Sequence, residues 1–264
     1  MNIISLGAGV QSTTLLLMAC HGEITPKPDY AIFSDTGWEP KAVYDHLEWL
    51  KKEAERFGIE VVITKKGNIK EDLMRAACEG ARVATMPFFI KSKSGKIGMI
   101  HRQCTQEYKV MPVRNKIREL LGYKPRQVIK EKVKLWMGIS LDEIERIKPS
   151  QVKWIENQYP LIEKGMDRIS CINWLKRKGY PVPPKSSCIG CPFHDNFAWK
   201  QLKMNSPDEW EDAVSVDRII RRLPKLKGEA YLHRSCQPLD KVYLQEDQLE
   251  LDLFANECTG YCGT

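Results

Sequence analysis

Strand-like and helix-like segments alternate through the first half of this chain, and this alternation constrains the fold more than any other feature. Short apolar or β-branched runs predict strands at residues 2–6, 30–33, 60–63 and 134–139. Helical spacing of apolar residues predicts helices at 12–21, 41–57, 69–78 and 113–121. Strands that alternate with helices favour a parallel sheet with helices on both faces.

The character of the sequence changes near residue 148. Prolines cluster at 181–184, and most of the cysteines and tryptophans lie beyond this point. We therefore expect a Rossmann-like α/β domain at 1–147 that binds a nucleotide. A helical, loop-rich region that binds a metal or cluster is expected at 148–244, and a flexible cysteine-containing tail at 245–264.

The composition bounds the location of the protein and its redox chemistry. No apolar run approaches the roughly 18 residues of a membrane span, and the start, MNIISLG, has no basic segment typical of a secretory signal. We expect a cytoplasmic protein with no membrane partner. The chain has nine cysteines, an odd number, and in a reducing cytosol they favour metal binding or catalysis over disulfides.

Positive charge is concentrated in one stretch of the chain. The net charge is +7, and residues 91–134 contain thirteen Lys or Arg against three Glu. Such a stripe suits a polyanion, either a nucleotide tail, a nucleic acid or an acidic partner. For residues 91–96 a solvated loop is the preferred interpretation, whereas beyond Arg102 we expect a functional role.

Residues 7–13 follow the first predicted strand and precede an apolar helix. The first loop of a parallel α/β sheet is a natural anion site, because the amides of the helix N-terminus point out of it. Gly7 and Gly9 allow close backbone approach, and Ser12 and Thr13 add hydroxyl groups. The loop has neither the lysine of a P-loop nor the third glycine of a dinucleotide fingerprint. A turn that binds no ligand is the alternative.

Two further segments carry candidate site residues. Asp35, Thr36 and Gly37 close the second strand, where they could contact the sugar or base of a nucleotide or simply form an Asx turn. Cys104 lies between Arg102 and Lys109, an environment that lowers the pKa of a thiol.

Five ordered segments resemble motifs of the phosphoadenylyl-sulfate (PAPS) reductase family, within the PP-loop or adenine nucleotide α-hydrolase-like superfamily. They are Gly7–Ser12 (the PP-loop), DTGWE at 35–39, C-T-x-x-x-K-x-x-P at 104–112, the G-x-x-x-x-E-x-x-R segment at 138–146 and C-I-G-C-P-F-H at 188–194. Departures are Gly7 for Ser and Gln11 for Asp in the loop, and Ser140 for Arg and Ile144 for Ser in the fourth segment. Glutamine at position 11 is compatible with the PAPS reductase branch.

The resemblance implies that residues 1–147 form a PP-loop domain and that a set of residues in it binds a nucleotide. The set is Ser5, Gly7, Ala8, Gly9, Gln11, Ser12, Thr13, Asp35, Thr36, Gly37, Arg102, Lys109 and Gly138. The nucleotide would be ATP, PAPS or APS. For Glu143 and Arg146, an i, i+3 surface ion pair is the structural alternative.

The C-x-x-C pair Cys188 and Cys191 supplies two thiolates on one turn, a common half-site for zinc or an iron–sulfur cluster. Iron–sulfur members of the superfamily place a cysteine in the C-T-x-x-x-K segment, which implies Cys104 as a ligand. The spacing from Cys171 to Cys188 resembles that of DNA phosphorothioation sulfur-transfer proteins. We therefore expect a [4Fe–4S] cluster on these four cysteines, with Zn as the alternative metal and Cys236 or His194 as alternatives to Cys171.

The tail contains Cys258 and Cys262 in the sequence ECTGYCG. It resembles the E-C-G-L-H tail of PAPS reductases, which implies Cys258 as a catalytic nucleophile and Cys262 as a resolving cysteine. A terminal segment with inert cysteines is the alternative.

The leading functional hypothesis is an enzyme that performs reductive sulfur transfer from a sulfonucleotide. A thioredoxin-like protein would be its electron donor, and a homodimer is one assembly that we consider. The rival is an ATP-dependent PP-loop sulfurtransferase that adenylates and thiolates tRNA or DNA, which the basic stripe favours. A third alternative is a non-catalytic nucleotide-binding module with structural zinc.

Overall fold

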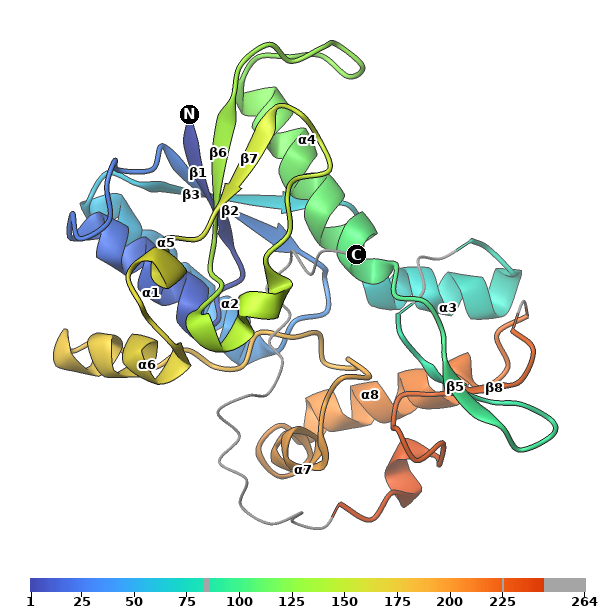
Figure 1. Cartoon of the computed structure of the whole chain (residues 1–264). Helices are drawn as coiled ribbons and strands as arrows, with labels where there is room; N and C mark the ends of the chain where they lie inside the picture. The colour runs from blue at the N-terminus through green and yellow to red at the C-terminus, as the bar shows by residue number, and fades with distance from the viewer. Residues whose placement is uncertain (83–85, 225, 245–264) are drawn as a thin grey trace.

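A computed structural model describes residues 1–82, 86–224 and 226–244 of the chain. Its centre is a five-stranded, fully parallel sheet with the strand order β3-β2-β1-β6-β7 (Figure 1). The strands are β1 (Asn2–Leu6), β2 (Tyr30–Asp35), β3 (Glu60–Lys65), β6 (Val133–Met137) and β7 (Ile155–Gln158). The predicted α/β class with a parallel sheet is confirmed.

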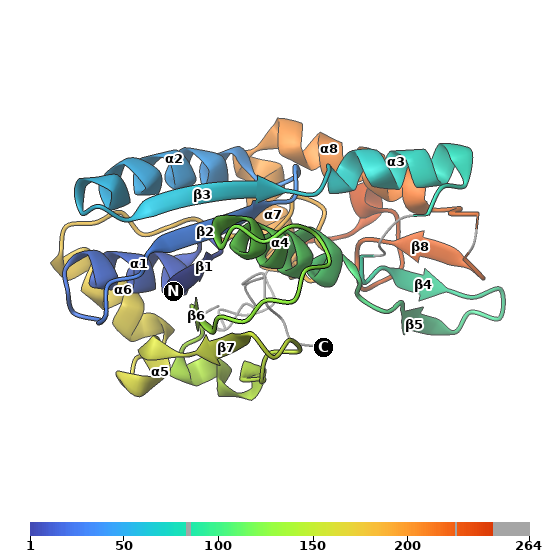
Figure 2. The ribbon, with the colours of Figure 1, turned by 90° about the horizontal axis from the view of Figure 1, so that it is seen from above.

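Helices cover both faces of this sheet, as Figure 2 shows from above. Side chains alternate along each strand, so Ile4 packs in one core with the helices α1 and α2, whereas Ile3 packs in another with α4. The helices of the first face are α1 (Val10–Cys20), α2 (Lys41–Arg56), α5 (Pro160–Glu163) and α6 (Arg168–Arg177), and α4 (Met111–Leu120) lies on the second face.

The helix α1 is buried on all sides. Every residue from Val10 to Ala19 is buried, because α1 lies between the sheet and the helices α2 and α6. Its apolar residues pack into the core around the sheet, and its buried polar residues lie in the first turns, next to the loop. The sequence LLLMAC after the first loop thus fixes the loop against the middle of the sheet.

A second core lies beside the carboxyl edge of the sheet. It is built around Trp199 and Trp210, both buried. Its elements are α3 (Ile69–Glu79), α7 (Asn196–Asn205), α8 (Pro207–Ile220) and a small antiparallel sheet of β4 (Phe89–Lys91), β5 (Ile97–Met99) and β8 (Glu229–Tyr231). The structure also contains three short helical segments, η1 (Gln106–Val110), η2 (Leu141–Arg146) and η3 (Leu239–Lys241).

The packing groups the segments differently from the predicted boundary at 147/148. The strand β7 and the helix α6 both follow residue 148. Even so, β7 extends the main sheet and α6 packs against α1. The helix α3 precedes that boundary but packs against α8 in the second core. Of the predicted segments, the tail 245–264 lies outside the described residues. Within the described part of the chain, no helix has the length and apolar character needed to cross a bilayer.

Candidate active site

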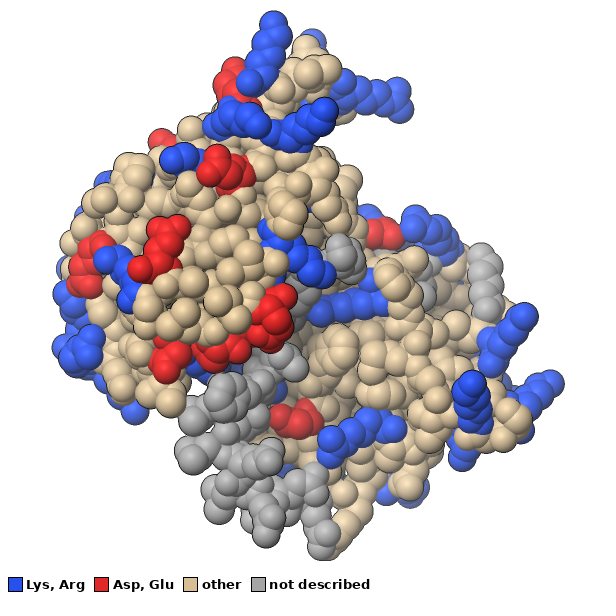
Figure 3. All heavy atoms as spheres, viewed as in Figure 1, with Lys and Arg blue, Asp and Glu red and all other residues tan. Residues whose placement is uncertain are grey.

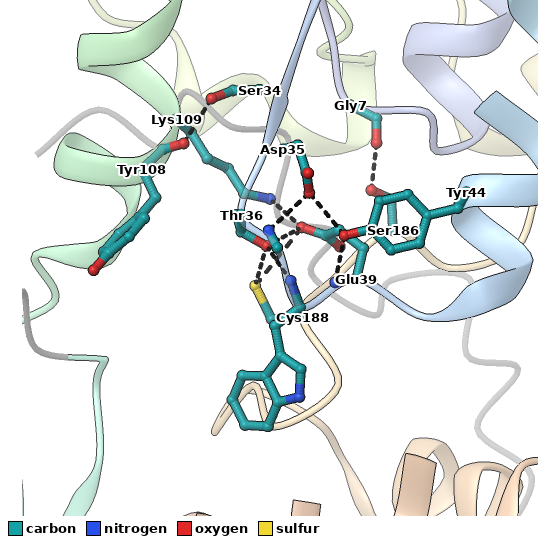
Figure 4. Close-up of polar contacts among 12 residues, drawn as sticks. Gly7, Ser34, Asp35, Thr36, Glu39, Tyr44, Tyr108, Lys109, Ser186 and Cys188 are labelled. Carbon is teal, nitrogen blue, oxygen red and sulfur yellow. Dashed lines mark hydrogen bonds and ion pairs between the residues drawn. The ribbon is translucent and has the colours of Figure 1, made fainter. Parts of the chain in front are cut away.

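The predicted nucleotide residues gather where β1, β2 and β6 end. These strands are parallel, so the loops that follow them lie at the same edge of the sheet. Ser5 is the penultimate residue of β1, and Asp35 ends β2. Figure 4 shows how the Gly7 carbonyl in the loop after β1 and side chains from the turn after β2, the segment before α4 and the C-x-x-C segment converge there.

The first loop has the geometry of an anion site. Ala8 has a φ of +57°, in the left-handed region that non-glycine residues rarely adopt, and Gly9 precedes the first turn of α1. No described side chain caps this helix, so backbone N–H groups at its start can bind an anion. The Ser12 hydroxyl accepts from the Gly7 N–H at 3.2 Å and so helps to close the loop.

Two contacts, made by Thr13 and Gly138, join the loop to α2 and to the end of β6. The Thr13 hydroxyl lies 3.0 Å from Nε2 of His46 on α2. Burial lowers the pKa of His46 to about 4, so the ring is neutral at pH 7. A Cβ on Gly138 would come within 2.7 Å of the Ser12 Cα. Gly138 therefore permits the end of β6 to lie directly against the loop.

The Gln11 side chain is engaged by protein groups. Its amide nitrogen donates to the Ser140 hydroxyl and to Glu143 Oε2, both at 3.3 Å, and its oxygen accepts from Arg168 at 3.1 Å. Glu143 also pairs with Arg146. Gln11 thus ties the first turn of α1 to η2 and α6, and a direct role of its side chain in nucleotide binding stays a prediction.

The turn after β2 is held by hydrogen bonds on its acidic and hydroxyl groups. Asp35 Oδ1 accepts from the Gly37 N–H and from the Tyr44 hydroxyl, each at 2.7 Å. The Thr36 hydroxyl donates to Glu39 Oε1 at 3.0 Å. The Asx turn that the sequence offered as one alternative is present, and contact of this turn with a nucleotide stays a prediction.

Three of the four predicted metal ligands line one cavity. Cys104, Cys188 and Cys191 form part of its wall. The cations Arg102 and Lys109 line it as well. Lys109 also lines a neighbouring pocket with Ser5, Gly7 and Ser34. This buried lysine therefore lies between the first loop and the thiol cavity.

Glu39 connects that lysine to the thiols. Its Oε1 lies 3.4 Å from Lys109 Nζ and 3.7 Å from Cys188 Sγ, and the Thr36 hydroxyl lies 3.4 Å from the same sulfur. Burial, and secondarily the charge of Glu39, raises the pKa of Cys188 well above its ordinary value. In this environment Cys188 is a thiol, and a metal or another cation is needed to stabilise the thiolate.

The C-x-x-C turn is packed tightly onto the end of β2. The Ile189 N–H donates to the Trp38 carbonyl at 2.9 Å, and a Cβ on Gly190 would lie 2.1 Å from the Trp38 ring. His194 Nε2 lies 3.1 Å from the Cys188 carbonyl. On the first-loop side, the Ser186 hydroxyl donates to the Gly7 carbonyl. These contacts place the C-x-x-C segment beside the first loop and the turn after β2.

The expectation that Cys171 is a ligand is corrected by its position. Cys171 is fully buried on α6, in the core that contains α1, whereas Cys188 and Cys191 pack in the second core. Burial raises its pKa to about 12. The 17-residue spacing from Cys188 therefore reflects a connection between two cores and does not bring the cysteines together.

The other candidates differ in position. Cys236 is buried and is not among the residues that line the thiol cavity. His194 supports the C-x-x-C turn, and burial lowers its pKa to about 4. Cys258 and Cys262 lie outside the described residues, so their roles stay predictions.

The donor chemistry around the cavity fits a soft metal centre. Thiols from two distant segments line it, and soft thiolate donors favour zinc or iron–sulfur groups. Glu39 Oε2, Thr105 Oγ1 and Ser187 Oγ are buried and have no hydrogen-bond partner among the described residues, as expected where a ligand completes a site. Within the described ranges, no three metal-binding side chains are already drawn together.

Sequence reasoning missed Glu39, Tyr44 and Trp38 as parts of the site. Glu39 and Trp38 stand in the segment DTGWE, directly after the strand. An acidic residue in the same turn as Asp35 and Thr36 was the available signal for Glu39. For Tyr44 and for the contact between Trp38 and Gly190, only the tertiary structure gives the information.

These observations define the class of the protein: an α/β chain with a parallel sheet, an anion-type loop after its first strand and a thiol-lined cavity at the same edge. No protein-family model matches the chain, and no curated protein matches it.

Among solved structures, the chain is similar to the U34-tRNA thiolase NcsA from Methanococcus maripaludis with its [4Fe-4S] cluster. The two share 13% sequence identity, and the match covers 100% of this chain and 80% of that chain with a TM-score of 0.43. A likeness at this level assigns neither a family nor an activity.

Proposed function

We propose that this chain is an ATP-dependent sulfurtransferase that acts on a nucleic acid, with Cys104, Cys188 and Cys191 as ligands of a [4Fe–4S] cluster. The observation that carries the proposal is the position of Lys109. Its side chain lines both the pocket beside the first loop and the cavity lined by these cysteines. A phosphate site and a soft-metal site that share one lysine suit a reaction in which ATP activation and sulfur delivery occur side by side.

The residues divide into two roles. Backbone N–H groups at the start of α1 and the Lys109 ammonium would bind the phosphates of ATP. The turn at Asp35–Gly37 would contact the ribose or base. Arg102, which also lines the cavity, would bind a phosphate of the nucleic acid. A bound cluster would supply the site at which sulfide is held.

The proposed chemistry replaces an oxygen of the nucleic acid by sulfur. That oxygen attacks the α-phosphorus of ATP, and pyrophosphate leaves. Hydrosulfide, the sulfur donor, then attacks the activated atom of the nucleic acid. The bond to oxygen breaks, and AMP leaves with that oxygen. The reaction requires no net reductant, in contrast to the reduction of a sulfonucleotide.

The segment around residue 140 favours sulfur transfer over sulfonucleotide reduction. The family that the sequence resembles has an arginine where this chain has Ser140. Ser140 is buried and accepts from the Gln11 amide, and Glu143 pairs with Arg146. This segment therefore supplies no arginine at position 140 for the second anionic group of a sulfonucleotide.

Reduction of a sulfonucleotide is the second candidate, because Arg102 and Lys109 line the thiol cavity together and two cations there also suit a sulfate.

The test of the proposed function is an anaerobic assay after reconstitution with iron and sulfide, with ATP in the presence and absence of tRNA or duplex DNA. We expect pyrophosphate release that depends on the nucleic acid. Sulfite release from PAPS without that dependence would favour the reductase, and zinc binding with neither activity would favour the non-catalytic module.

Cysteine variants test the ligand set in the same preparation. Cys188→Ser should lose most of the bound iron and the brown absorbance of the cluster, since its thiolate is a proposed ligand. The matched control is Cys171→Ser, which should keep its iron content because Cys171 lies in the other core. Equal iron loss in both variants would contradict the assignment.

A further inference from the structure

The connection between α4 and β6 forms a basic groove at the opposite edge of the main sheet. Its wall contains four cations and one acid together with Trp154: Arg118, Lys130, Lys132, Lys153 and Glu131. The acid, Glu131, accepts a hydrogen bond from the Tyr123 hydroxyl at 2.5 Å. Figure 3 shows Lys and Arg side chains gathered on the projection that corresponds to this connection in Figure 1.

Hydrogen bonds give this connection a defined shape. Arg118 donates to the carbonyl of Gln127 at 2.5 Å, and the Lys124 N–H donates to the Gln127 side chain at 2.6 Å. Lys132 donates to the carbonyl of Lys153 at 2.5 Å, which ties the connection to the segment before β7. The cations are therefore presented by an ordered loop, in contrast to the lysines of a solvated tail.

We propose that this groove, defined by Arg118, Lys130, Lys132, Lys153 and Trp154, binds the phosphodiester backbone of the nucleic-acid substrate. Ammonium and guanidinium groups bind phosphates at any sequence, and a half-exposed tryptophan can stack on a base or sugar. The lysines Lys124 and Lys134, close to the groove residues in sequence, are also exposed. This inference rests on the proposed function and specifies the size of its substrate.

The distance between the groove and the thiol cavity sets that size. Lys109 directly precedes η1's last residue, and Arg118 lies near the far end of α4. The ten residues of α4 span about 15 Å at 1.5 Å per residue. At about 3.4 Å per base pair, a substrate that reaches both places extends at least about five base pairs from the modified nucleotide. A mononucleotide or very short oligonucleotide cannot occupy both sites.

Binding of total tRNA and of a DNA duplex, measured by fluorescence anisotropy over a series of salt concentrations, tests the inference. The variant is Lys130→Ala with Lys153→Ala, two exposed lysines of the groove. We expect about a 10-fold loss of affinity and a slope of log K against log salt that is shallower by about 2. The matched control is Lys51→Ala with Lys52→Ala on α2, exposed lysines on the other face of the sheet, which should bind as the wild type does.

The two nucleic acids separate the sources of phosphate. A loss confined to tRNA or to DNA would support the inference and identify the substrate as RNA or DNA. Unchanged affinity and salt slope in the groove variant would overturn it and leave the groove to an acidic protein. Because the assay requires no turnover, this failure is distinct from that of the proposed function, which is an absence of nucleic-acid-dependent pyrophosphate release.

Discussion

At the scale of single residues, the site depends on close contacts that no other residue type would permit. Gly190 lies against the buried Trp38 ring, whose Nε1 donates to Asp212 at 2.6 Å. Gly138 lies against the backbone of Ser12. Gly190 lets the C-x-x-C turn lie against the turn after β2, and Gly138 lets the end of β6 lie against the first loop. Their value is in the space that they leave, since neither has a φ in the left-handed region.

The replacement Gly190→Ala should displace the C-x-x-C turn, because the new Cβ would lie 2.1 Å from the Trp38 ring. We expect a loss of about 1–3 kcal/mol in the free energy of unfolding and reduced iron loading. Urea unfolding and iron analysis measure these effects. Gly98→Ala is the control, since a Cβ there meets nothing within 4 Å; equal losses in the two variants would refute the packing argument.

The buried histidines predict a pH dependence of stability. Burial lowers the pKa of His46 to about 4, below its ordinary value near 6.5. Between these values the unfolded chain binds a proton that the folded chain does not, so the free energy of unfolding falls as the pH falls from 6.5 towards 4. His46→Gln should reduce that slope by up to about 1.4 kcal/mol per pH unit. Urea unfolding at several pH values measures it, and parallel slopes for variant and wild type would contradict the account.

At the scale of elements, α8 organises the region that carries the C-x-x-C turn. The buried Asp217 on α8 accepts from the N–H groups of Leu232 at 2.8 Å and Leu239 at 3.1 Å, and it pairs with Arg221. Asp212, one turn earlier, bonds Trp38 and pairs with Lys70 on α3. The helix thereby joins the small sheet, α3 and the end of β2.

Asp217→Ala should cost about 3 kcal/mol in the free energy of unfolding, because two buried N–H groups and an arginine lose their acceptor. Thermal or urea unfolding measures the loss. Glu211→Ala on the exposed side of the same helix should change stability by less than about 0.5 kcal/mol. A loss of that small size for Asp217→Ala would show that the carboxylate is not needed.

Sequence reasoning recovered the elements with strong local patterns and missed those that depend on distant contacts. The apolar spacing at 43, 47, 50 and 54 predicts α2 closely, because the buried face of a half-buried helix is apolar at helical spacing. The strand β7, with the sequence IENQ, has little apolar content of its own and pairs only because β6 lies beside it. The small antiparallel sheet joins residues 89–99 to 229–231, which no local pattern reveals.

The sequence predicted the positions of the candidate site residues with the same uneven success. Motifs that end a strand or begin a helix, such as residues 7–13 and 35–37, lie at one edge because the sheet is parallel. The spacing of Cys171 and Cys188 did not predict their positions correctly, because the chain passes from one core to the other between these two residues. The interaction between Glu39 and Lys109 joins segments that are 70 positions apart (109 − 39 = 70), and only folding brings them together.

At the scale of the whole molecule, the three candidate regions lie at different ends of the main sheet. The first loop lies at the carboxyl edge of the main sheet. The thiol cavity is lined by residues of that edge and of the second core, and the basic groove is lined by the segments before β6 and β7, at the opposite edge. The helix α4 runs between the segment that carries Lys109 and the segment that forms the groove. This arrangement suits a long polyanion that is held at one end and modified at the other.

The length of the substrate should therefore affect affinity. A nucleic acid that extends well beyond five base pairs can reach both the groove and the cavity, whereas a trinucleotide can occupy one of them. We expect a trinucleotide to compete poorly with labelled tRNA, by at least about 100-fold in concentration, because it forms few of the phosphate contacts. Competition anisotropy measures the ratio, and equal potency per molecule would contradict a substrate that spans both sites.

The central claim is that sulfur is transferred to a nucleic acid at the expense of ATP. The most direct test is mass spectrometry of the nucleosides or linkages from tRNA and DNA after anaerobic incubation with the reconstituted protein, ATP and labelled hydrosulfide. We predict a product in which labelled sulfur replaces one oxygen, formed only with ATP and lost in Cys188→Ser. Labelled sulfur in no nucleic-acid product, together with sulfite formed from PAPS, would contradict the account.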